Sequence, residues 1–188
     1  LEFITRVDGR PSVGTFRTVY QADAKLSGDL KGGFDDTSIT GVDDSFIAST
    51  KYGIKLSTQE FTSPSGADAT AVWQALKDQP GLAIVNASLV PARNGFAFDP
   101  SSDDFSLAAV DGLFIENTMM EPVEIIVRDR ESATTFTLTV IGVLDNWASG
   151  GPVPGGIYTS TGTLEAELSR EVDATQFFFN IDAGTQDG

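Results

Sequence analysis

The chain has 188 residues, which fits a single domain, with room for two lobes. Twelve Lys and Arg side chains stand against 27 Asp and Glu side chains, so the formal net charge is −15, and the chain contains no Cys and no His. These counts exclude disulfides, thiol catalysis, Ser-His-Asp hydrolysis and the usual transition-metal sites. The negative charge repels phosphate backbones, so we expect no nucleic-acid partner.

No stretch of the sequence reaches the 18 or more apolar residues that a transmembrane helix needs, and no basic-then-apolar leader is visible. The chain begins at Leu1 without an initiator Met and ends at Gly188. We therefore expect a domain excised from a longer polypeptide; the alternative is that tags were trimmed or the termini were processed.

Two segments are predicted to be helices. The first covers 68–79, with Ser65 and Asp68 resembling a capping box before it and Pro80 and Gly81 ending it. Its apolar face, spaced by three and four residues, consists of Ala69, Val72, Trp73 and Leu76. This spacing predicts that Trp73 belongs to the core.

The second helix is predicted over 162–170, where Leu164 and Leu168 form a short apolar stripe. Thr161 or Thr163 is its expected N-cap, and Arg170 suits its last turn.

Each predicted helix lies between two strand-like segments, 46–56 and 82–85 around the first and 157–159 and 177–181 around the second. Another strand is predicted at 16–24, whereas 29–44 is rich in Gly and Asp and is predicted to be a loop. Two β-α-β units predict an α+β fold, with one mixed sheet and its helices on one face.

The segment from 93 to 156 lacks a helical pattern. It offers strands at 105–107, 113–115, 123–127 and 135–144, and the last two flank a hairpin turn at 129–132. We expect a small β-rich lobe, 93–156, inserted into an α/β lobe formed by 1–92 and 157–188, so that 1–188 is one domain.

The sequence contains no motif that predicts chemistry. The acidic groups at 35–36, 43–44 and 99–104 lack the ligand spacing of a calcium-binding EF-hand loop, and the Gly-rich loop 150–156 lacks the Lys of a phosphate-binding loop. No serine-nucleophile motif occurs. We therefore predict no catalytic, cofactor-binding or metal-ligating residue, no cofactor, and a protein that is not an enzyme.

One residue is a candidate for partner contact. Trp147 follows a predicted strand at the edge of a loop, where a partly exposed indole can stack on a sugar or pack against a protein. The alternative is that Trp147 fills the joint between the two lobes.

Several phrases, in order, resemble the extracytoplasmic domain of FtsX-like ABC transporter permeases of the MacB/LolE type. They are VDDSF (42–46), AVWQAL (71–76), PGLAIVN (80–86), LVP (89–91), PVEIIV (122–127), LTVIGVL (138–144), GIYTS (156–160) and TQFFF (175–179). The resemblance covers roughly residues 42–184 and does not extend to the first 40.

The resemblance implies a porter-like α/β lobe carrying a β-rich lobe, exposed on the extracytoplasmic side of the cell membrane. It implies transmembrane helices on both sides of the domain, a separate ATP-binding subunit, and a second permease copy or homologue. The implied function is mechanotransmission, in which ATP-driven motion of the helices drives export or extraction of a cargo or signals to an envelope partner.

Two further functions stay open from the residues alone. A secreted or cell-surface module could bind a carbohydrate or a protein through loops around Trp147. A carboxylate-dependent enzyme would need two acids facing each other across a cleft, and 27 acidic residues do not single out a pair.

Overall fold

The computed structural model describes residues 6–7, 10–11, 14–29, 32–93, 104–145 and 155–179. The helices are α1 (Asp44–Ser49), α2 (Ala69–Asp78) and α3 (Thr161–Leu168), with short 3₁₀ turns at Gln59–Phe61 and Ala87–Leu89. The strands are β1 (Arg6–Val7), β2 (Arg10–Pro11), β3 (Gly14–Leu26), β4 (Asp35–Val42), β5 (Ile54–Ser57), β6 (Thr62–Ser63), β7 (Gly66–Ala67), β8 (Leu82–Asn86), β9 (Val123–Asp129), β10 (Thr135–Leu144), β11 (Ile157–Ser160) and β12 (Gln176–Phe178).

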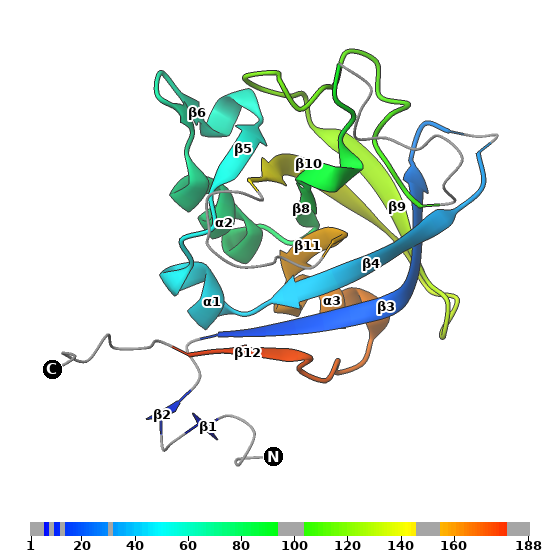
Figure 1. Cartoon of the computed structure of the whole chain (residues 1–188). Coiled ribbons are helices and arrows are strands. Elements are labelled where there is room, and N and C mark those ends of the chain that lie inside the picture. The colour runs from blue at the N-terminus through cyan, green and yellow to red at the C-terminus, as the bar shows by residue number, and fades with distance from the viewer. Residues whose placement is uncertain are drawn as a thin grey trace, which may run out of the picture.

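The main sheet closes on itself. Its hydrogen-bonded order is β3, β4, β11, β8, β10 and β9, and β9 pairs back onto β3 through Ala22–Leu26, so these strands form a barrel (Figure 1). β12 extends the sheet beyond β3, and β5 extends it beyond β10. β4 and β11 run parallel, as do β8 and β10, and the other pairs are antiparallel. The expected α+β class with a mixed sheet is confirmed.

Strand β3 makes closure possible because it is long and bent. It has 13 residues, and its register with β4 shifts between Val19 and Ala22. Such a bulge bends a strand and increases its twist. The far half of β3 therefore pairs with β4 on one side and with β9 on the other.

Two hydrophobic clusters occupy the two sides of the sheet. All the barrel strands contribute to the interior cluster, which includes Ala24, Ile39, Val85, Ile125, Leu138 and Ile157. The outer cluster lies between the sheet and helices α1 and α2, and it includes Phe16, Phe46, Val72, Trp73, Leu76, Ile84 and Tyr158. Alternate residues of β8 show the division, because Ala83 and Val85 face inward while Ile84 faces α2.

The helices do not share one face of the sheet, which corrects that part of the expectation. α2 packs its apolar stripe into the outer cluster, whereas Leu164 and Leu168 of α3 belong to the interior cluster. The sequence showed an apolar stripe on each helix, but closure of the sheet decides which stripe faces which side.

The predicted helices and their caps agree with the structure in part. The first helix lies within the predicted range, but its N-cap is Asp68 alone, whose carboxylate accepts a hydrogen bond from the Ala71 N–H at 3.0 Å. The N-cap of α3 is Ser160, not a threonine, and α3 ends at Leu168, before Arg170. The hairpin of β9 and β10 forms around the predicted turn.

Three segments differ from the prediction. The expected loop at 29–44 contains β4, whose acidic start is exposed and whose end, Ile39–Val42, is buried. The expected strand at 46–56 begins as α1, because the Asp43 carboxylate accepts from the Phe46 N–H at 2.7 Å and caps a helix there. Residues 105–107 and 113–115 form loops and not strands. Phe105, Leu107 and Leu113 of these loops pack into the interior cluster.

The described part of 93–156 does not form a sheet of its own. β10 lies between β8 and β9 and also pairs with β5, and β9 pairs with β3. The strands expected in an inserted lobe are therefore strands of the barrel. Within the described residues, no helix has the length and apolar character needed to cross a membrane.

Candidate functional site

The first and last strands of the main sheet in chain order, β3 and β12, lie side by side. β12 runs antiparallel to the start of β3, with Phe178 opposite Gly14 and Gln176 opposite Phe16. The Thr175 N–H donates to the Phe16 carbonyl at 2.8 Å, and the Thr175 hydroxyl donates to the same oxygen at 3.0 Å. Figure 1 shows β12 and the start of β3 together at one edge of the barrel. We call this pair of strands the exit.

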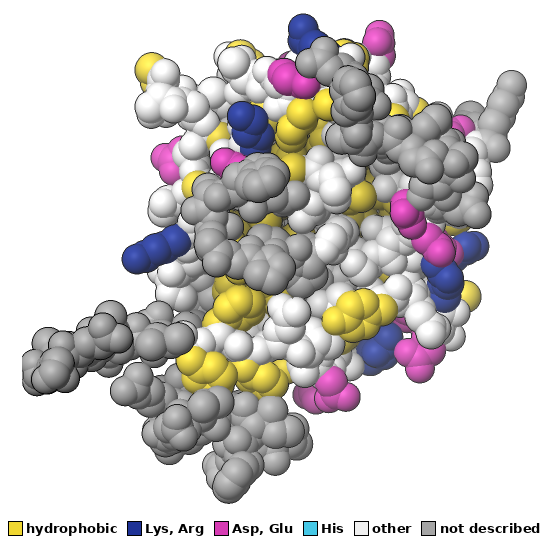
Figure 2. Space-filling view, viewed as in Figure 1, with side chains coloured by type: hydrophobic (Ala, Val, Ile, Leu, Met, Phe, Trp, Pro, Cys, Tyr) yellow, Lys and Arg dark blue, Asp and Glu magenta, His cyan; other side chains and the backbone are white. Residues whose placement is uncertain are grey.

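Aromatic side chains connect the exit to the helices. Phe178 lies 4.5 Å from Phe16 and 5.0 Å from Phe46 between ring centroids, and Phe46 lies 5.8 Å from Trp73. Together with Tyr52 and Tyr158, these residues form the aromatic cluster: Phe16, Phe46, Tyr52, Trp73, Tyr158 and Phe178. Hydrophobic side chains also gather over β12 on the surface (Figure 2). The cluster therefore links the exit to α1 and α2 by contiguous packing.

Close backbone packing and a hydrogen bond fasten β3 to α1. A Cβ added at Gly14 would lie 2.6 Å from the Cβ of Phe46 and 2.7 Å from its Cα, so only glycine allows this approach. The Thr15 hydroxyl donates to the Asp43 carboxylate at 2.6 Å, and Asp43 is the N-cap of α1. The close packing and this hydrogen bond therefore fix the start of β3 against α1.

A network of charged groups lies farther along β3. Asp23 is 4% exposed and accepts hydrogen bonds from Arg128 and Arg130 of the β9 hairpin. The Arg128 Nε lies 3.0 Å from the Asp23 carboxylate, and Arg130 also forms an ion pair with Asp36. Burial by itself would raise the pKa of Asp23, but the hydrogen bonds and positive charges of the two guanidinium groups outweigh it and hold that pKa below its usual range.

Asp129 is held in a similar way at the end of β9. It is 1% exposed and accepts hydrogen bonds from the Ser132 hydroxyl at 2.7 Å and from Arg170 at 3.3 Å. Burial opposes ionisation of Asp129, but these donors, with the N–H groups of Glu131 and Ser132, lower its pKa. Both buried carboxylates are therefore structural anions that hold β3, β9 and the segment after α3 together.

We expect the protein to lose stability in acid for this reason. Because the folded pKa values lie below the unfolded value of about 3.9, the stabilisation is complete above that pH and is lost as pH falls through the folded values. Urea unfolding between neutral pH and about pH 3 measures this slope. Asp23→Asn should cost about 1.5–3 kcal/mol at neutral pH and flatten the acid slope. An acid slope equal to that of wild type would show that Asp23 is not one of the groups responsible.

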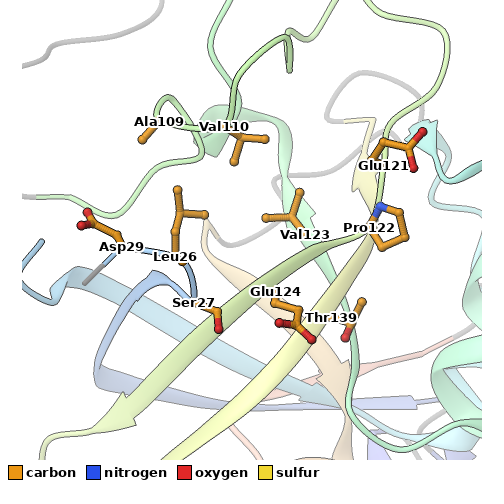
Figure 3. A pocket seen from close by; sticks show the side chains of 11 residues that line it. Leu26, Ser27, Asp29, Ala109, Val110, Glu121, Pro122, Val123, Glu124 and Thr139 are labelled. Carbon is orange, nitrogen blue, oxygen red and sulfur yellow. The ribbon is translucent and has the colours of Figure 1, made fainter. Parts of the chain in front are cut away.

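An open groove lies at the opposite end of β3 from the exit. Its volume is about 880 Å³, and it is bounded by the end of β3, the start of β9, Thr139 of β10 and two parts of the loop between β8 and β9. In Figure 3, Leu26, Val110 and Val123 point toward one another at its centre, while the carboxylates of Asp29, Glu121 and Glu124 lie around them. No Lys or Arg is among the described residues that line it.

Three acidic side chains of the groups at 35–36 and 43–44 have structural roles. Asp36 pairs with Arg130, Asp43 caps α1, and Asp44 pairs with Lys77 at 3.1 Å. Across the described ranges, no group of three or more acidic side chains is arranged to hold a metal ion. Trp147, the candidate for partner contact, lies outside the described residues. Sequence reasoning missed the groove, because its residues come from four separate segments.

Comparison with known proteins gives a structural likeness and no sequence match. No protein-family model matches the chain, and no curated protein matches it. Among solved structures, the chain is similar to an extracellular domain of an ABC-type transporter, the kind of domain that its sequence resembles. That protein is the noncanonic transporter YknZ from Gram-positive bacteria, with 13% sequence identity and a TM-score of 0.43 over 93% of this chain and 71% of that chain.

Proposed function

We propose that this chain is the extracytoplasmic domain of an FtsX-like ABC transporter permease and works as a mechanical lever. The observation that carries the proposal is the exit, where Phe178 pairs with Gly14. Segments joined to the two ends of the fold leave from one place, as a domain inserted between two transmembrane helices requires. The ordered phrases that resemble this family support the same reading.

The exit can pass a displacement into the fold. A helix joined to either end would act on β3 or β12, and the aromatic cluster carries that displacement to α1 and α2. Packed cores transmit strain because they contain few voids. In this role the domain needs rigid packing and two arrangements of the whole transporter, not reactive side chains.

The partners follow from this role. A separate ATP-binding subunit would drive the motion, and a second permease copy or homologue would supply the opposing lever. A cargo or an envelope protein would be moved or signalled to by the two levers. The domain would lie outside the cell membrane and have no enzymatic activity of its own.

Labelling of intact cells tests the location. Tyr20, 64% exposed, is replaced by Cys in the full-length gene product made free of other cysteines, and the buried Thr40 is replaced by Cys as the matched control. A membrane-impermeant maleimide is expected to label Tyr20→Cys in intact cells and Thr40→Cys only after denaturation, and the protein should stay in the membrane fraction with an ATPase. A gene product released into the medium would overturn the proposal and favour a surface binding module.

The lever itself is tested by Phe178→Ala in the purified permease–ATPase complex. A dye on Tyr20→Cys is expected to report an ATP-dependent movement in the parent protein, and Phe178→Ala should remove most of it because the link between β12 and α1 is broken. Phe34→Ala is the control, since Phe34 packs against Lys25 and Arg128, away from the exit. An unchanged movement in Phe178→Ala would show that the aromatic cluster does not carry the coupling.

A further inference from the structure

We propose that the groove at the far end of β3 binds a cationic amphipathic peptide segment. The site belongs to this chain alone, so it can be tested whether or not the chain is part of a transporter. Its volume of about 880 Å³ lies within the range of ligand sites, roughly 300–1,000 Å³.

The centre of the groove is apolar. Leu26 from the end of β3, Val110 from the loop and Val123 from the start of β9 converge there, and Pro122 borders them (Figure 3). Leu26 and Val110 remain partly exposed. An occupant that covers them with an aliphatic side chain removes this apolar surface from water.

A smaller cavity adjoins the groove. It has about 180 Å³, shares Val110, Glu121 and Val123 with the groove, and adds Met119 and Met120. Met119 is 46% exposed, and methionine adapts its shape to different apolar partners. Two adjacent cavities suit successive side chains of a peptide better than one compact ligand.

The negative charge at the groove favours an occupant with positive charge. Glu121 and Glu124 are exposed at its border, and within the described part of the chain neither one forms an ion pair. In contrast, Asp23 and Asp129 on the same strands are each bonded to arginine. Among the described residues, the charges of Glu121 and Glu124 are therefore not balanced by an ion pair, and Lys or Arg side chains of an occupant complement them.

Peptide binding to the 188-residue chain tests the proposal. The probe is a fluorescein-labelled peptide of about ten residues with alternating Lys and Leu, compared with the same peptide carrying Gln or Glu in place of Lys. We expect the Lys peptide to bind, the Glu peptide not to bind, and added NaCl to weaken binding because exposed charges are screened.

Matched variants separate the groove from the general acidity of the chain. Glu121→Gln/Glu124→Gln should weaken binding of the Lys peptide about tenfold, which corresponds to two surface charge contacts. Glu167→Gln/Glu171→Gln removes the same charge from exposed positions on and after α3 and should leave the affinity within about twofold. Val110→Thr, which keeps the side-chain shape, should weaken binding without changing the thermal midpoint.

Each other outcome overturns the proposal. An equal loss of affinity for the Lys peptide in the two double variants would mean diffuse attraction to an acidic protein. Equal binding of the Gln peptide would mean a purely apolar site that fits a lipid chain as well as a peptide. No binding of the Lys peptide at low salt would mean that the groove has no such ligand.

Discussion

Trp73→Ala is expected to lower the free energy of unfolding by about 3–5 kcal/mol, the range for removing a buried large aromatic side chain. Trp73 is 2% exposed on the inner face of α2 and packs edge-on against Phe46 with ring centroids 5.8 Å apart. Its Nε1 donates a hydrogen bond to the Tyr52 carbonyl at 3.0 Å. The substitution leaves a cavity and an unpaired carbonyl at once.

Thermal and urea unfolding measure this effect. For a chain of this length, the loss corresponds to a fall in thermal midpoint of about 6–20 °C. Trp73→Phe keeps most of the ring and should cost less, and Gln74→Ala, on the exposed side of the same turn, should change stability by no more than about 0.5 kcal/mol. A midpoint in Trp73→Ala equal to that of wild type would contradict the packing of α2.

Gly156→Ala is expected to lower the free energy of unfolding by a similar amount, for a different reason. Gly156 has φ = 104°, and a Cβ there would lie 2.4 Å from the backbone oxygen of Ser38. The strained backbone costs about 1–3 kcal/mol and the steric overlap about as much again, so the total is about 2–6 kcal/mol. The Gly156 carbonyl also accepts from the Asn86 N–H at 2.9 Å, so a shift at Gly156 disturbs the end of β8.

The neighbouring glycine provides the control. A Cβ at Gly155 meets nothing within 4 Å. Gly155→Ala should therefore change the urea midpoint little, while Gly156→Ala shifts it strongly with an unchanged slope. Equal midpoints for the two variants would mean that β11 does not enter the barrel at Gly156 as described.

The proposed lever and the proposed peptide site share one strand. β3 begins at the exit with Gly14 and ends at the groove with Leu26. Its middle is held by the buried Asp23 and its arginine partners. The two proposed sites are therefore connected by the backbone of a single strand.

The sequence by itself determined the elements whose signals are local. The helix at 68–79 was predicted to within about a residue because its apolar spacing and the Pro-Gly stop lie within a dozen positions. The hairpin of β9 and β10 was found because alternation and a turn are also local signals. The burial of Trp73 followed from the same helical spacing.

Only the tertiary structure decided the architecture and the candidate site. The Asp- and Gly-rich segment at 35–42 is a strand because β3 and β11 pair with it, and Gly41 lies where α3 packs closely. Closure of the barrel joins β9 to β3, about a hundred residues earlier in the chain, and no local pattern encodes such a partner. The groove and the exit are built from segments more than a hundred residues apart, so they arise from long-range pairing that periodicity and composition do not specify.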